Sequence, residues 1–356
     1  MSEIVIDADY PATSMDDGHI INLTGMVPAT ISYGPPGSYS TIHRNEIYNR
    51  SPALWRIAVD GYADPLKLYP GQSAFVQMGN AGWFRSDQRR WVKKYPEFYC
   101  DPFGSDVAGD GLGPGAGRAF RNPQKAVSAA LYDVDSVGTT PKILLADNAM
   151  FGPSYEYAPF LVTADGLGAN QVQVLGNVDA PANCIIARST PGDIAYSKDK
   201  GILLIKGVWL RPYVNNVTCL RSGHGGVIDQ GRNIFGHAPG GHHQVAEDGG
   251  VVNSNEDYAI WGGGVTHMAS MNGGNIFAGG PPLVVTIANV PQFIYFGLAS
   301  DARIWTSGVV SYIGNVAANT RKFLTQESGG LILNGTVMPG DVPGFANPAS
   351  FGWVRH

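Results

Sequence analysis

A single aliphatic position recurs through the second half of the chain, while its neighbours vary between polar, charged and small residues. Five segments share this pattern and begin 24, 24, 28 and 28 residues apart. Their aliphatic positions are Ile228, Val252, Ile276, Ile304 and Ile332. A further segment, 200–204, fits the same frame one repeat earlier. A repeat of this length with one fixed interior column predicts a solenoid.

The residue types within the repeat predict strands. The segments are rich in Gly, Val, Ile, Asn and Thr, and they lack the runs of Ala, Leu, Glu and Lys that favour helices. Three strands of about five residues with three turns make about 24 residues, which is one coil of a parallel β-helix whose neighbouring coils lie about 4.8 Å apart. Apolar stretches at 142–146 and 171–175 predict looser strands before the regular coils.

The rest of the chain divides into distinct segments. Residues 1–84 carry short strand-like runs separated by turn signals, which predict a small antiparallel β-sandwich or barrel. Residues 85–120 form a connector that begins with interleaved basic and aromatic residues and continues into a glycine-rich loop. Asn122 is a candidate N-cap, Pro123 suits the first helical position, and the residues that follow form an apolar helical face. These features predict a capping helix at the start of a β-helix domain that spans residues 121–335. Residues 336–356 form a C-terminal tail.

Composition narrows the class of protein. With 47 Gly and 24 Pro against 15% charged residues, the chain is predicted to be all-β. The net charge of -5 disfavours nucleic acid as a partner, so we interpret the basic-aromatic connector as a surface packed on a neighbouring subunit. The three Cys form neither a disulfide framework nor a zinc pattern, and the pattern of the first residues argues against a secretory signal. No later segment is long and apolar enough to predict a membrane span. We therefore expect folding in a cytoplasm, without membrane insertion.

A family resemblance rests on the segment that leads into the coils. The order of a glycine loop at Asp110-Gly111, then Phe120, then a Pro-Gln-Lys-Ala-Val helix at 123–127 resembles the beginning of pectin-lyase-like right-handed β-helices, notably those of bacteriophage tailspikes and tail fibres. Residues 324–344 are similar to the ends of phage tail-fibre proteins. The resemblance spans about residues 105–345. It implies a homotrimer in the virion tail, synthesised in the host cytoplasm, that docks on tail or baseplate proteins through residues 1–84 and faces bacterial surface polysaccharide.

Cysteine and histidine residues recur at the repeat spacing. Carrying the register backwards places Cys219, His243, His267, Tyr295 and Phe323 in one column. Cys and His are the favoured ligands of zinc and copper, so the first three are candidate metal ligands. Rungs about 4.8 Å apart do not readily converge on one ion, and aromatic residues continue the column. Stacking is therefore the favoured interpretation, and we expect no metal or cofactor.

Acidic residues are sparse on the coils. A glycoside hydrolase needs two carboxylates at a defined separation, whereas a lyase needs a base and a charge-neutralising cation. Asp229, Glu247 and Asp257 are the catalytic candidates, because they lie on adjacent predicted rungs. Acids in turns are more often solvated turn formers.

Aromatic residues on the coils are candidates for a glycan-binding or subunit surface. Phe277 and Trp305 directly follow aliphatic positions of the interior column, so strand alternation predicts that both point outward. Such rings can stack on sugars or be buried against another subunit, and both interpretations stay open. The further candidates are Trp209, Tyr213, Trp261 and Tyr295.

The resemblance and these residue patterns together favour one function class. The prediction is a structural tail fibre or tailspike that contacts host surface glycan. A polysaccharide depolymerase is the alternative, and a monomeric cellular β-helix protein is the least favoured class.

Overall fold

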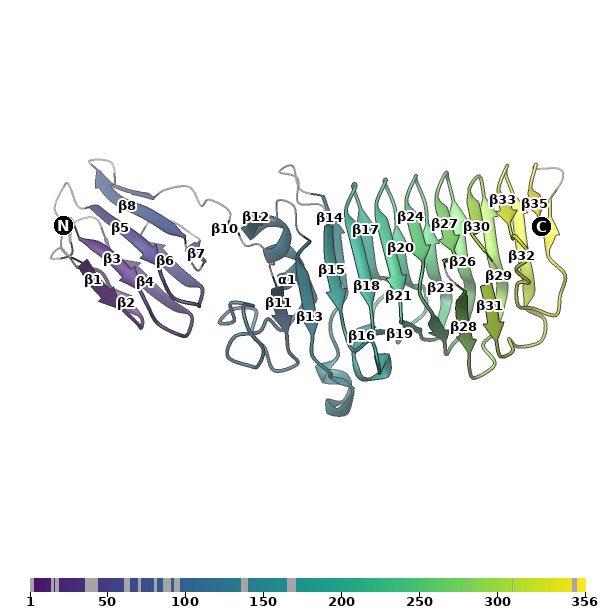
Figure 1. Ribbon diagram of the computed structural model, residues 1–356, viewed down its shortest axis with the longest axis horizontal. Helices are drawn as coiled ribbons and strands as arrows, with labels where there is room; N and C mark the ends of the chain where they lie inside the picture. The colour runs from purple at the N-terminus through teal and green to yellow at the C-terminus, as the bar shows by residue number, and fades with distance from the viewer. Residues whose placement is uncertain are drawn as a thin grey trace.

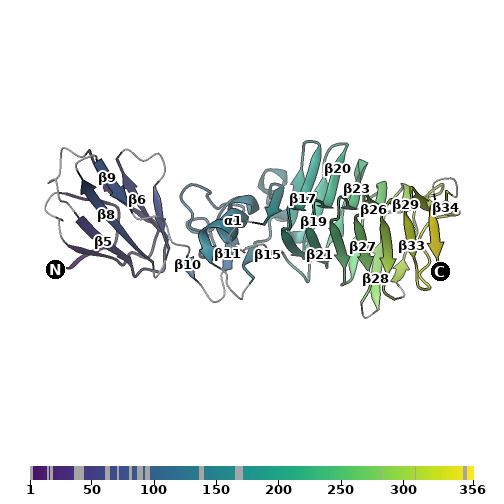
Figure 2. The ribbon, with the colours of Figure 1, turned by 90° about the horizontal axis from the view of Figure 1, so that it is seen from above.

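The computed structural model describes residues 3–13, 16, 19–35, 44–60, 65–69, 72–79, 82–85, 91–92, 97–135, 140–164, 171–280, 282–308, 310–347 and 351–356. Strands dominate these residues. A small pair of sheets lies at the N-terminal end, and a stack of parallel coils extends from there to the C-terminus (Figure 1). The view from above shows the same sequence of units along one long axis, so the molecule is an elongated rod (Figure 2). The predicted all-β fold with a parallel β-solenoid is confirmed.

Within the described residues, parallel sheets of ten, eight and six strands form the three faces of the solenoid. Face A contains β11 (Glu97–Cys100), β13 (Lys142–Leu145), β15 (Gln171–Leu175), β18 (Ile202–Lys206), β21 (Val227–Gly231), β24 (Val251–Ser254), β27 (Asn275–Ala278), β30 (Arg303–Thr306), β33 (Gly330–Ile332) and β35 (Trp353–Arg355). Face B contains β14 (Phe160–Thr163), β17 (Gly192–Lys198), β20 (Val217–Ser222), β23 (Ala238–Ala246), β26 (Gly264–Met271), β29 (Phe293–Ser300), β32 (Arg321–Gln326) and β34 (Phe345–Ala346). Face C contains β16 (Ile185–Arg188), β19 (Trp209–Pro212), β22 (Ile234–Phe235), β25 (Tyr258–Ile260), β28 (Leu283–Ile287) and β31 (Val310–Ile313).

The aliphatic column of the sequence lies on face A. Ile228, Val252, Ile276 and Ile304 pair in register from coil to coil, and all four are fully buried. The predicted fifth member was wrong by one residue, because Leu331 pairs with Ile304 while Ile332 pairs with Trp305 on the outer side. The same slip occurs before the column, where Leu203, not Leu204, pairs with Ile228. In both coils the slip reflects a turn whose length differs by one residue from the predicted frame.

The turn from face B to face A explains the polar and glycine positions of the repeat. His224, Asp248 and Asn272 have φ values of 48°, 49° and 48°, and the glycine after each of them is also left-handed. Asn, Asp and Gly adopt this conformation at least cost. On three coils, a serine at the end of the face B strand donates a hydrogen bond of 2.7 to 2.8 Å to the carbonyl that closes the turn. The recurring motif is therefore a turn with its own side-chain support.

The predicted helix is present at the start of the coils. Helix α1 (Pro123–Ser128) continues into a π-helical turn, η3 (Ala129–Asp133), and packs against β11, β13 and β14. Gln124 exchanges hydrogen bonds with the backbone of Leu161 in β14. Asn122 makes no side-chain cap, contrary to the prediction, because its amide donates to Asp106. Short 3-10 turns follow at η4 (Ala149–Phe151), η5 (Pro153–Tyr155) and η6 (Pro181–Asn183).

The N-terminal unit is a two-sheet sandwich, but the expected antiparallel arrangement was largely wrong. One sheet has the order β1 (Glu3–Ile6), β3 (Ile20–Leu23), β5 (Arg44–Asn49), β8 (Ser73–Gly79) and β9 (Gly82–Arg85), and the other has β2 (Tyr10–Pro11), β4 (Ala29–Tyr33), β6 (Trp55–Val59) and β7 (Leu66–Leu68). From β1 to β6 the chain alternates between the sheets, so neighbours within each sheet run parallel. The pairings that involve β7, β8 and β9 are antiparallel.

The glycine-rich segment after β11 joins the two units, and we call this contact the Asp110 joint. The fully buried Asp110 carboxylate accepts hydrogen bonds from the backbone N–H of Leu54 at 3.2 Å and of Leu112 at 2.9 Å. It also pairs with Arg118 at 3.1 Å, and Arg118 donates to the carbonyl of Pro52. These contacts attach the N-terminal unit to the first coils. β10 (Trp91–Val92), in the intervening segment, pairs with β12 (Val134–Asp135).

Candidate functional site

The predicted Cys and His column is only partly correct. The flanking register places Cys219, His243 and His267 on successive face B strands, and all three are fully buried. Tyr295 and Phe323 are not members, because Tyr295 pairs with Thr266 and Phe323 pairs with Gly297. By the same register Phe296 follows His267. The coil between β26 and β29 is one residue longer than the repeat frame allowed.

The two buried imidazoles satisfy each other as neutral rings. His243 donates from Nε2 to the carbonyl of Gly236 at 2.9 Å, which leaves its Nδ1 to accept from Nδ1–H of His267 at 3.0 Å. Nε2 of His267 then accepts from the hydroxyl of Tyr258 at 2.9 Å. Burial lowers the pKa of His243 to about 3 and holds that of His267 well below its ordinary value. Among the described residues, no group of three or more His, Cys, Asp or Glu is placed to hold a metal ion.

No two of the three predicted catalytic acids, Asp229, Glu247 and Asp257, lie together on one face of the solenoid. Asp229 lies on face A and accepts a hydrogen bond from Asn253 at 2.6 Å, in the column that the repeat predicts. Asp257 precedes β25 on face C and accepts from the backbone N–H of Val284. Glu247 lies in the turn from face B to face A. Residues on adjacent rungs converge only if they share a face, and these three do not.

The predicted aromatic pair is present on face A. Phe277 and Trp305 pair in register with ring centroids 5.6 Å apart, and Trp305 is 41% exposed. Trp261 belongs to another surface, because it follows β25 and meets the edge of Trp209 at 5.3 Å on face C. Tyr295 is half-buried in β29 on face B. The candidate aromatics therefore lie on three faces.

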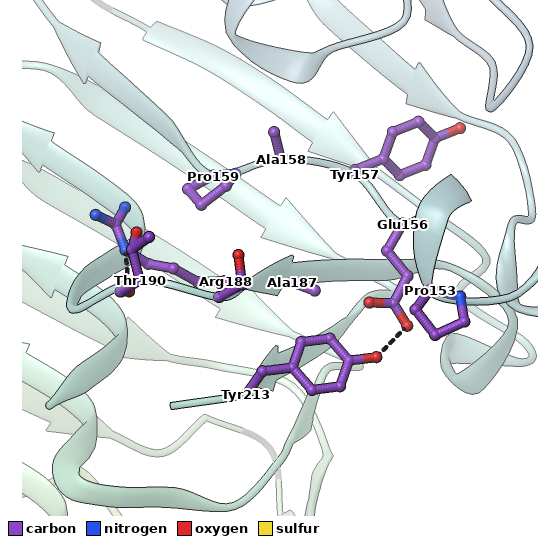
Figure 3. Close-up of a pocket in the computed structure, with 10 residues that line it drawn as sticks. Pro153, Glu156, Tyr157, Ala158, Pro159, Ala187, Arg188, Thr190 and Tyr213 are labelled. Atoms are coloured by element: carbon purple, nitrogen blue, oxygen red, sulfur yellow. Dashed lines mark hydrogen bonds between the residues drawn. The ribbon is translucent and has the colours of Figure 1, made fainter. Parts of the chain in front are cut away.

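Two adjoining cavities lie at the corner where the first coils pass from face C to face B. They share Pro159 and Arg188, and we call them together the groove. The Glu156 cavity, of about 430 Å³, is lined by Pro153, Glu156, Tyr157, Ala158, Pro159, Ala187, Arg188, Ser189, Thr190 and Tyr213 (Figure 3). The Asp193 cavity, of about 290 Å³, is lined by Gln124, Pro159, Phe160, Leu161, Arg188, Gly192, Asp193 and Tyr196.

A buried carboxylate faces the first cavity. The side chain of Glu156 is 4% exposed, and its Oε1 accepts hydrogen bonds from the hydroxyl of Tyr213 at 2.8 Å and from Arg211 at 3.2 Å. Burial and this bond raise the pKa of Tyr213 to about 12. The guanidinium of Arg211 lies 4.6 Å from the ring centroid of Trp209 and 5.0 Å from that of Tyr213. Cation–π contacts of this kind fix the orientation of the rings.

The second cavity borders a cluster of opposite charges. Arg221 Nη1 donates to Glu247 at 3.1 Å, and Arg221 Nε lies 2.9 Å from Asp193 as an ion pair that is not aligned for a hydrogen bond. Burial raises the pKa of Asp193, and Arg221 opposes that shift. Burial, followed by the charge of Glu247, raises the pKa of Tyr196. Of the predicted catalytic acids, only Glu247 belongs to this cluster.

Sequence reasoning missed Glu156 and Asp193. Both precede the regular repeats, where no interior column fixes a register. Tyr213 and Trp209 were candidates as exposed aromatics, but nothing in their spacing pointed to Glu156. A local signal does exist: the alternation Trp209, Arg211, Tyr213 places three large polar or aromatic side chains on one side of a strand.

The fold and the groove define this chain as a parallel β-solenoid protein with a two-sheet N-terminal unit. Comparison with protein-family models, with curated proteins and with solved structures found no match. No helix within the described ranges is long and apolar enough to cross a bilayer.

Proposed function

We propose that the protein is a structural virion protein, a tail fibre or tailspike, that contacts bacterial surface polysaccharide. The observation that carries the proposal is a groove of carboxylates, arginines and aromatic rings on a rigid rod. Exposed rings stack on the apolar faces of sugars, and fixed polar groups bind their hydroxyls. A solenoid holds such groups in fixed positions on a hydrogen-bonded scaffold.

Residues 1–84 are the proposed attachment domain for tail or baseplate proteins. Their two-sheet unit lies at the end of the rod opposite the C-terminal coils (Figure 1). The Asp110 joint supports this role, because its hydrogen bonds and ion pair hold the N-terminal unit against the segment that leads into the coils.

Self-association is proposed through face A. Its outward positions include apolar side chains in two columns that also contain Asp229, Asn253, Asn275 and Arg303: Ile202, Leu204, Val227, Val251, Phe277, Trp305, Ile332 and Trp353. Phe277, Trp305 and Ile332 follow one another in register, and a monomer rarely leaves such a group of apolar side chains in water. The trimeric state, and the right-handed coil, come from the family resemblance.

The second candidate function is a polysaccharide depolymerase. The observation that favours it is the Asp193–Arg221–Glu247 cluster beside the groove, because it combines two carboxylates with the cation that a lyase requires. A hydrolase would create reducing ends, whereas a lyase would create a double bond that absorbs in the ultraviolet.

The first test combines solution mass with polysaccharide binding. Light scattering after size exclusion should give a mass near three chains, and the full-length protein should bind at least one purified polysaccharide from a panel of bacterial envelopes. A monomer that binds no polysaccharide contradicts the proposal. Binding with release of reducing ends or unsaturated products identifies the depolymerase instead.

A further inference from the structure

One oxygen of the buried Glu156 carboxylate lacks a hydrogen-bond partner. Oε1 is fully used by Tyr213 and Arg211, whereas Oε2 is buried and has no donor among the described residues. Figure 3 shows the second oxygen turned away from Pro153, toward the side of the cavity formed by Ala187. A buried carboxylate oxygen without a donor is costly, so the arrangement favours a ligand that supplies one.

We infer that the Glu156 cavity is a subsite for a neutral, hydroxyl-rich sugar unit, with Glu156 accepting from a sugar hydroxyl and Tyr213 stacking on the ring. The inference rests on the proposed function and names the ligand class of its groove.

Tyr213 is held ready for stacking. Its hydroxyl is fixed by Glu156 at 2.8 Å and its ring by Arg211, while 43% of the residue stays exposed. A ring that is already ordered loses little side-chain entropy on binding. The loss of affinity on removing such a ring is therefore expected to exceed the loss on removing a freely rotating one.

The rest of the lining suits the amphipathic surface of a sugar. Ala158, Pro159 and Ala187 present apolar atoms to its C–H groups, and Ser189 and Thr190 carry hydroxyls that can donate or accept. A volume of about 430 Å³ falls within the range of roughly 300 to 1,000 Å³ that is usual for ligand sites.

Charge favours a neutral sugar over an acidic one. The carboxylate of Glu156 repels a uronic acid, and its partner Arg211 is already engaged by it. Arg188 also lines the cavity, but its guanidinium donates to the backbone carbonyls of Thr190, Pro191 and Asp193. Neither arginine therefore presents a free fork to a ligand carboxylate.

The test uses the full-length chain and an array of neutral and uronic-acid-bearing oligosaccharides from bacterial envelopes. Calorimetry then measures the dissociation constant of the strongest neutral oligosaccharide. We expect Glu156→Gln to weaken binding about tenfold, because a charge-assisted hydrogen bond becomes a neutral one. Tyr213→Ala should weaken it at least tenfold, and Tyr213→Phe should weaken it less, because the ring remains.

Matched controls come from outside the groove. Asp301→Asn makes the same change of carboxylate to amide at an exposed turn, and Phe345→Ala removes a ring that is 47% exposed on the last face B strand. Both should bind as the unmodified chain does, and unchanged melting temperatures should show that all variants fold.

Three results would overturn the inference. Recognition of acidic oligosaccharides alone contradicts the ligand class. Neutral binding that Glu156→Gln and Tyr213→Ala leave intact moves the site elsewhere while the proposed function stands. An unmodified chain that binds no oligosaccharide of the array removes both the subsite and the glycan-binding part of the proposed function.

Discussion

At the scale of one residue, a substitution of Ile276 tests whether the aliphatic column lies in the interior. It is fully buried between Val252 and Ile304, so Ile276→Asp would place an unpaired charge in the core. We expect the free energy of unfolding to fall by about 4 kcal/mol or more. Asn275→Asp, one residue away on the outer side, should change it by less than about 1 kcal/mol. Equal urea midpoints for the two variants would contradict the assigned register.

The buried His243 and His267 and the half-buried His242 predict a loss of stability in acid. Burial lowers the pKa of His242 to about 4 and that of His243 to about 3, and His267 shifts in the same direction. In the unfolded chain histidines titrate near about 6.5, so on acidification the unfolded state binds protons first. Stability is therefore complete above about pH 6.5 and declines toward pH 4, by at most about 1.4 kcal/mol per pH unit for each histidine.

Urea midpoints measured between pH 7 and pH 5 check this expectation. His242→Gln should reduce the slope by about one third, because one of the three titrating groups is gone. Ser311→Gln, which changes an exposed side chain that does not titrate, should leave the slope as it is. A stability that does not change over this range would mean that the rings are not held neutral.

Face A is the element whose outer side we expect to be covered. Phe277→Ser removes half of an aromatic pair without touching the buried column, so the single chain should keep its unfolding midpoint. The mass measured by light scattering should fall from about three chains toward one. Ile313→Ser, which removes an exposed aliphatic side chain from face C, should leave the mass unchanged. If both variants keep the same mass as the unmodified chain, face A is not the assembly surface.

At the scale of the whole molecule, the Asp110 joint is expected to couple the unfolding of the N-terminal unit to that of the coils. Arg118→Met removes the cation beside a fully buried carboxylate, which then keeps only backbone donors. We expect a loss of about 2 kcal/mol and an earlier unfolding step of the N-terminal unit, because an uncompensated buried charge is costly. Arg56→Met, which loses one hydrogen bond to the carbonyl of Val107 on a more exposed surface, should cost less than about 1 kcal/mol. Calorimetry distinguishes them, and equal traces would show that the joint does not couple the two units.

The regular coils were predictable because their signals are local. Strand alternation alone sends Ile276 inward and Phe277 outward, and left-handed residues such as His224, Asp248 and Asn272 mark the described passages from face B to face A in the regular coils. The prediction slipped by one residue where the spacing between paired residues differed from the predicted spacing, as at Leu331 and Phe296. A repeat spacing counted along the sequence does not reveal where a turn gains or loses a residue. The backbone hydrogen bonds between neighbouring coils do reveal it, because they define which residues pair.

The sequence by itself determined the class of element, the interior column and the turn chemistry, since each depends on residues a few positions apart. Only the tertiary structure decided the parallel pairing of the N-terminal sheets, the burial of Asp110 and the meeting of Glu156 with Tyr213 and Arg211. Glu156 and Tyr213 are 57 positions apart and belong to coils without a common repeat. Their contact depends on how irregular turns place the strands side by side. No local sequence pattern predicts that placement.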